Sequence, residues 1–121
     1  MLIKITPVPK PRTTQRDRWA KRPIVERYYA FADELRLKYT QKLPDNLDLV
    51  FMMPMPKSWS KKKREEMYLK PHQQRPDIDN LIKAVMDSLC EDDSYVFSVS
   101  AVKFWDKEGG ILIDEKSDTA D

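Results

Sequence analysis

The chain has 121 residues, of which 40% are apolar, so it is long enough for one domain with a modest core. Its single cysteine excludes an internal disulfide and favours a cytosolic protein, and no apolar run approaches the roughly 18–20 residues that a membrane helix needs. Residues 1–76 hold 18 Lys/Arg against 8 Asp/Glu, a charge of +10, whereas residues 77–121 hold 4 against 12, a charge of −8. Either the first part binds a polyanion and the second divalent cations, or the two halves neutralise each other within one fold.

The first elements are a short strand, a basic segment and a helix. Residues 2–6 alternate between apolar and polar types, which predicts a strand that the prolines at 7, 9 and 11 end. Residues 10–22 carry six basic side chains without a clear period, and they are interpreted as a loop or arm. From Pro23 the apolar positions follow helical spacing, which predicts a helix over about 23–40.

The middle of the chain predicts a strand, a basic helix and an amphipathic helix. Residues 47–56 are apolar enough for a strand buried on much of both faces, and two prolines end it. Ser58 can cap a short basic helix over 58–70, and residues 71–76 form a connector. Apolar residues at 78, 81, 82, 85, 86 and 89 predict an amphipathic helix.

The last elements are predicted to be two strands. Residues 90–94 indicate a turn and residues 95–105 a long strand. Gly109 and Gly110 suggest a hairpin turn to a partner strand at 111–113. The fold class is therefore a single mixed α/β domain over residues 1–113, with a small sheet packed on helices in the order β-α-β-α-α-β-β. Residues 114–121 are expected to form a disordered tail.

Two aspartates stand where the amphipathic helix begins. Residues two apart do not share a helix face, so Asp77 and Asp79 can reach one ion only if Asp77 lies outside the helix. Pro76 favours that arrangement, because it fixes its own φ and pushes Arg75 toward extended geometry. Lys83 follows one turn after Asp79 on the same face. Carboxylates beside a lysine suit Mg²⁺, which prefers oxygen ligands and can activate water for attack on a phosphodiester.

Ordinary structural roles would also explain these residues. Aspartate is common at helix starts, Asp79 and Lys83 would form an ordinary surface pair, and Asp92–Asp93–Ser94 would form a plain turn. Spacing alone does not decide between these roles and a metal site.

The motif resembles the RusA-like family of Holliday-junction resolvases over RPDIDNLIKAVMDSL and the following EDDSYV. That family's pattern is a basic residue, then D-x-D-N-L-x-K, a further aspartate on the helix, and a D-D pair before a strand. The residues that match are Asp77, Asp79, Asn80, Leu81, Lys83, Asp87, Asp92 and Asp93.

The resemblance implies a Mg²⁺-dependent homodimer, in which Mn²⁺ can substitute, that resolves four-way DNA junctions by paired symmetric nicks in recombination and repair. It implies metal binding by Asp77, Asp79 and Asp93 and a catalytic role for Lys83. The connection between the helix and the D-D pair is short here, which leaves Asp92 and Asp93 as alternatives. No organic cofactor or membrane is implied, and the family is often encoded by phages or prophages.

Basic side chains flank the motif and are the predicted DNA contacts. A solvated helix face would also explain those at 61–64. Two alternatives to a nuclease are a non-catalytic DNA-junction-binding protein of the same fold and a structural protein whose aspartates cap a helix. The predicted contacts are Lys10, Arg12, Arg16, Arg18, Lys61, Lys62, Lys63, Arg64 and Arg75.

Overall fold

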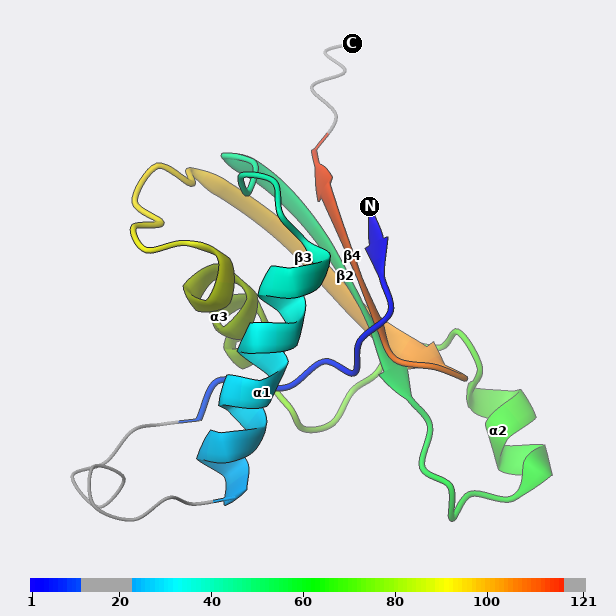
Figure 1. Cartoon of the computed structure of the whole chain (residues 1–121). Coiled ribbons are helices and arrows are strands. Elements are labelled where there is room, and N and C mark those ends of the chain that lie inside the picture. The colour runs from blue at the N-terminus through cyan, green and yellow to red at the C-terminus, as the bar shows by residue number, and fades with distance from the viewer. Residues whose placement is uncertain (12–22, 117–121) are drawn as a thin grey trace, which may run out of the picture.

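The computed structural model describes residues 1–11 and 23–116, and it confirms the single mixed α/β fold and the order of its elements (Figure 1). A four-stranded sheet lies beside the helices. In chain order the elements are β1 (Leu2–Ile3), α1 (Pro23–Lys38), β2 (Asn46–Pro54), α2 (Lys61–Met67), α3 (Ile78–Leu89), β3 (Ser98–Asp106) and β4 (Gly110–Glu115).

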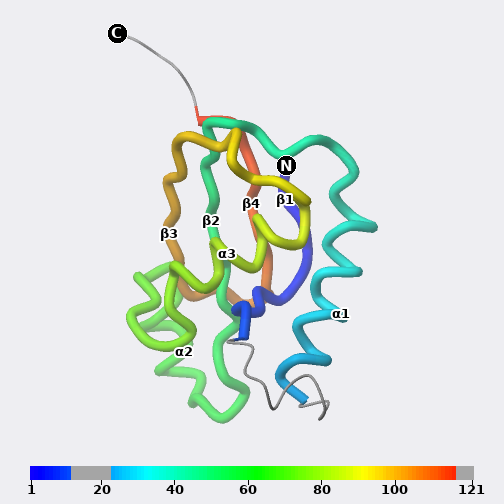
Figure 2. The backbone as a smooth tube through the Cα atoms, turned by 90° about the vertical axis from the view of Figure 1, so that its left-hand side faces the viewer, coloured from blue at the N-terminus to red at the C-terminus, as the bar shows by residue number. Residues whose placement is uncertain are grey.

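The strand order in the sheet is β1-β4-β2-β3. β2 and β3 run parallel, with Val50 opposite Val102, whereas β4 runs antiparallel to both β2 and β1. Parallel neighbours need a crossover connection, and residues 55–97, which contain α2 and α3, provide it. The start of α3 is therefore brought to the end of the sheet where β2 and β3 finish (Figure 2).

The predicted hairpin at Gly109–Gly110 is wrong, because β2 lies between β3 and β4. Neither glycine has a positive φ, whereas the favoured two-residue hairpin turns need one. Close approach explains Gly109 better. A Cβ atom there would lie 2.7 Å from the Cα of Thr6, so only glycine lets the connection pass the N-terminal segment.

α1 and α3 pack on one face of the sheet (Figure 1). β2 alternates strictly, and its inward residues Leu47, Leu49 and Phe51 are fully buried. The prediction that this strand is buried on both faces is therefore only half right. The alternate positions face the side away from these helices, where Leu2, Leu112, Val50 and Val102 form one row across the four strands. Leu2 and Val102 at the ends of this row are each 55% exposed.

Several boundaries differ from the expected ones. The basic helix covers Lys61–Met67 and is capped by Ser60, whose hydroxyl accepts the backbone N–H of Lys63 at 3.2 Å, rather than by Ser58. β4 continues to Glu115, which pairs with Leu47, so the strand passes the expected domain end at residue 113. In the part of the chain that the structure describes, no helix is long and apolar enough to cross a membrane.

Candidate active site

The backbone before α3 has the conformation that the proline predicted. Asp77 is the N-cap residue, with φ −70° and ψ 146°, which is extended, and the helix begins at Ile78. The Asp77 carbonyl accepts the N–H of Leu81 at 3.2 Å, but the Asp77 side chain makes no capping hydrogen bond. The exposed carboxylate is thus not used to stabilise the helix, which removes the main ordinary explanation for it.

Asp79 and Lys83 lie on the exposed side of α3. Both side chains are exposed, while Leu81, Ala84 and Val85 turn into the core. No ion pair joins Asp79 to Lys83 among the residues described, so the ordinary surface pair is absent. Asp77 thus lies directly before α3, Asp79 lies in its first turn, and Lys83 follows one turn after Asp79, all with exposed side chains.

Asp87 is separated from this group by an ion pair with the N-terminal segment. The Lys10 ammonium binds the Asp87 carboxylate, and the Lys10 backbone N–H donates to the carbonyl of Asn80 at 3.2 Å. The hydrogen bond to Asp87 raises the pKa of Lys10. Lys10 was predicted as a phosphate contact, but its charge already neutralises a carboxylate of the chain.

The aspartate pair after α3 lies at the other end of that helix. Asp92 is exposed, and its carboxylate accepts the N–H of Ser94 at 3.0 Å, which lowers the pKa of Asp92. Asp93 is half-buried, and its carbonyl accepts the N–H of Val96 at 3.0 Å. Twelve helical residues span about 18 Å, and this length separates Asp93 from Asp77 and Asp79 within one chain. Over residues 1–11 and 23–116, no three His, Cys, Asp or Glu side chains are close enough to share an ion.

β3 passes the start of α3 and brings a lysine there. The Lys103 ammonium donates to the carbonyls of Gln74 and Pro76, both at 2.6 Å. Burial lowers the pKa of Lys103, and the charge of Asp77 acts in the opposite direction. Sequence reasoning missed this residue, because its contacts with Gln74 and Pro76 depend on the assembled fold.

The basic surface of α2 lies toward the same end of the sheet (Figures 1 and 2). Lys61, Lys62 and Lys63 are exposed, whereas Arg64 is half-buried and donates to the carbonyl of Pro56 at 3.1 Å. The Trp59 ring packs against Trp105 with 4.7 Å between ring centroids and so attaches this segment to β3. Arg75 is exposed in the loop before Asp77. The predicted contacts Arg12, Arg16 and Arg18 lie outside the described residues.

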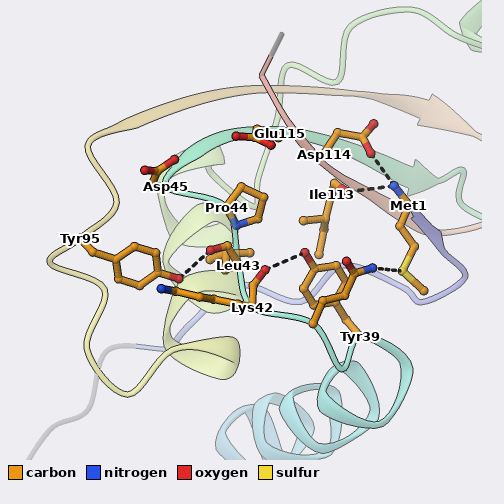
Figure 3. Close-up of a pocket in the computed structure, with 11 residues that line it drawn as sticks. Met1, Tyr39, Lys42, Leu43, Pro44, Asp45, Tyr95, Ile113, Asp114 and Glu115 are labelled. Atoms are coloured by element: carbon orange, nitrogen blue, oxygen red, sulfur yellow. Dashed lines mark hydrogen bonds and ion pairs between the residues drawn. The ribbon is translucent and has the colours of Figure 1, made fainter. Parts of the chain in front are cut away.

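A hollow of about 470 Å³ lies at the opposite end of the sheet (Figure 3). Tyr39, Leu43, Tyr95 and Asp114 contribute to its lining, and the Tyr95 hydroxyl donates to the Leu43 carbonyl at 2.7 Å. None of the predicted site residues within the described ranges lines it. The acidic group stands instead on the exposed start of a helix, where a long polymeric substrate can reach it.

Comparison with known proteins matches most of the chain to one family. The family described as endodeoxyribonuclease RusA matches residues 4–114. The uncharacterized protein YqaN of Bacillus subtilis (strain 168) is 38% identical over 74 residues, which cover 54% of this chain and 51% of that protein. The chain thus spans about half the length of this curated relative. No solved structure gave a significant match.

Proposed function

Because the chain belongs to the endodeoxyribonuclease RusA family, we propose that it is a metal-dependent endonuclease that resolves four-way DNA junctions. In this proposal a homodimer makes paired symmetric nicks, one at each of two equivalent sites. The observation that carries the proposal is the extended backbone of Asp77 directly before α3. In this conformation the Asp77 carboxylate makes no capping hydrogen bond, and in this proposal it holds one ion together with Asp79, with Lys83 one turn after Asp79.

The donor groups at this helix start fit Mg²⁺. Mg²⁺ is commonly held by one or two carboxylates together with waters and substrate phosphate oxygens. Asp77 and Asp79 supply such a pair, and both are exposed. Mn²⁺ accepts the same oxygen ligands and can substitute.

The chemistry then follows from the groups present. Asp77 and Asp79 would hold a divalent ion, which would supply a Lewis acid and lower the pKa of bound water. Lys83 places a positive charge on the same side, where it offsets the negative charge that develops on the phosphate. The lysines of α2 and Arg75 contact the DNA backbone and hold it over the site.

Asp93 stays a predicted third ligand. Since α3 separates it from Asp77 and Asp79 within one chain, an ion shared by all three requires Asp93 of the partner subunit. A two-fold dimer could supply it twice, once for each site.

The open face of the sheet supports the homodimer. Leu2, Leu112, Val50 and Val102 form a continuous apolar row on the side opposite α1 and α3. Exposed apolar patches of this kind often mark protein interfaces. A self-complementary interface of two such faces would bring two nuclease sites into one particle.

Cleavage of a synthetic four-way junction tests the proposal. We expect matched nicks on two opposing strands in Mg²⁺ and none in EDTA. Asp79→Asn should abolish cleavage while it preserves, or tightens, junction binding, because it removes a negative charge that repels DNA. Asp33→Asn, which changes an exposed carboxylate on α1, is the matched control. Junction binding without cleavage in Mg²⁺ or Mn²⁺ would contradict catalysis and leave a non-catalytic binding protein.

A further inference from the structure

The loop over residues 71–76 determines how Asp77 is presented. It leaves the edge of β3, where the N–H of His72 donates to the Lys103 carbonyl at 3.1 Å and the N–H of Trp105 donates to the Lys70 carbonyl at 3.0 Å. It must then reach the start of α3 without continuing into helical geometry. The backbone hydrogen bonds to β3 fix the first half of this loop, but something else must fix its second half.

The Lys103 side chain does this. Lys103 pairs with Phe51 of β2, on the side of the sheet that α1 and α3 cover. Its half-buried side chain donates to the carbonyls of Gln74 and Pro76, at 2.6 Å each. Lys103 therefore holds the loop twice, through its own carbonyl at His72 and through its ammonium at Gln74 and Pro76.

The position of these bonds matters for the site. The Pro76 carbonyl belongs to the peptide group that joins Pro76 to Asp77, so its direction is tied to the φ of Asp77. A hydrogen bond from a charged group to a carbonyl is roughly twice as strong as a neutral one. Two such bonds can hold an extended N-cap whose own side chain makes no capping hydrogen bond.

We propose that Lys103 is a positioning residue for the metal site, which fixes the backbone at Pro76 so that the carboxylates of Asp77 and Asp79 face one ion. This inference rests on the proposed function, since it assigns the residue that holds the loop from which Asp77 and Asp79 follow. Groups that orient metal ligands typically change metal affinity by about 10–100-fold when they are removed.

Lys103→Met tests the inference because positioning and charge predict opposite results. Methionine removes both hydrogen bonds and the positive charge beside Asp77. Loss of the charge alone would strengthen cation binding, since the ammonium repels a second cation. Loss of positioning would weaken it. We expect Mn²⁺, measured by the electron paramagnetic resonance signal of the free ion without DNA, to bind about tenfold more weakly.

Lys38→Met is the matched control. The Lys38 ammonium also donates to a backbone carbonyl, that of Lys4 at 2.7 Å, and it lies on α1 away from the candidate site. This control should leave Mn²⁺ affinity unchanged. Lys103→Arg keeps the charge and the hydrogen-bond donors, so it should bind Mn²⁺ more tightly than Lys103→Met.

Both far-UV circular dichroism and the melting temperature are recorded for every variant. Lys103→Gln replaces Lys103→Met if the latter does not fold.

The outcomes separate this inference from the proposed function. Unchanged or tighter Mn²⁺ binding by the Lys103 variant, in a protein that binds Mn²⁺ and cuts junctions, would overturn the positioning role alone. An arginine variant as weak as the methionine variant would overturn it too. An unaltered protein that neither binds Mn²⁺ nor cuts DNA would overturn the proposed function, and the positioning role with it.

Discussion

Replacing the three lysines at positions 61–63 with alanine should flatten the salt dependence of junction binding. These side chains are exposed along α2, at the end of the sheet that also carries the start of α3. For every phosphate that the protein no longer neutralises, the slope of log K against log salt should fall by roughly 0.9 in duplex DNA. The change should therefore appear in the slope as well as in the affinity.

The structure sets the size of this effect. The Lys63 ammonium lies 4.7 Å from the centroid of the Trp59 ring, so its charge is already partly engaged. Two or three phosphate contacts give a slope change of about 1.8–2.7. Between about 50 and 200 mM salt, the advantage of the unaltered protein over the variant should therefore shrink by roughly 12- to 40-fold.

The assay measures junction affinity in EDTA across a salt series, and then single-turnover cleavage in Mg²⁺ at saturating protein. The matched control replaces three exposed lysines away from this surface, which removes the same net charge but leaves the α2 surface intact. An unchanged slope in the α2 variant would mean that these lysines form only a solvated helix face. Failure to cut bound junction would mean that they reach the site itself. The control positions are Lys38, Lys42 and Lys116.

Three further predictions concern the dimer, the shared site and pH. Asp77→Asn and Asp93→Asn proteins should each be inactive. If each site combines two subunits, an equal mixture should form mixed dimers in which about a quarter of all sites are intact. A mixture that stays inactive in strand-nicking assays argues for sites within one chain. Val102→Glu, at a 55% exposed position of the open sheet face, should shift the protein to monomer in light scattering, whereas Leu37→Glu, at an 81% exposed position of α1, should not. Burial lowers the pKa of His72, which is 4% exposed. The stability that comes from keeping this imidazole neutral is therefore fully present above the unfolded pKa of about 6.5, and it is lost as the pH falls below that value. The melting temperature should therefore drop between about pH 7 and 5, and His72→Phe should make this drop smaller; an equal drop in both proteins would assign it to other groups.

The sequence predicted the helices and strands better than it predicted which strands pair in the sheet. The apolar spacing of residues 78–89 predicted an amphipathic helix that begins near Asp79 or Asn80, and α3 covers Ile78–Leu89. The pairing of β4 was missed because a short connection between two strands usually means a hairpin, and nothing local shows that β2 occupies the place between them. Ser58 was predicted to cap the basic helix, but the helix begins later, at Lys61, and Ser60 caps it.

The candidate site was predictable where it depended on local geometry. Pro76 and the two-residue spacing were enough to place Asp77 outside the helix, as it is. The ion pair of Lys10 with Asp87 joins residues that are 77 positions apart in the sequence. The hydrogen bonds of Lys103 join residues that are 27 and 29 positions apart. Such contacts depend on the assembled fold, so no local pattern could reveal them.

The sheet order also determines when this chain can fold during synthesis. β1 pairs with β4, so Leu2 cannot pair before Leu112 has been synthesised. Both neighbours of the central strand β2 are the later strands β3 and β4. Pairings this distant in sequence form late and carry a large loop-closure cost. No strand of the sheet therefore has a partner until β3, residues 98–106, has been synthesised. Loss of residues 110–115 would remove two of the three strand pairings at once, so such a truncation should leave an unfolded chain and not a slightly smaller domain.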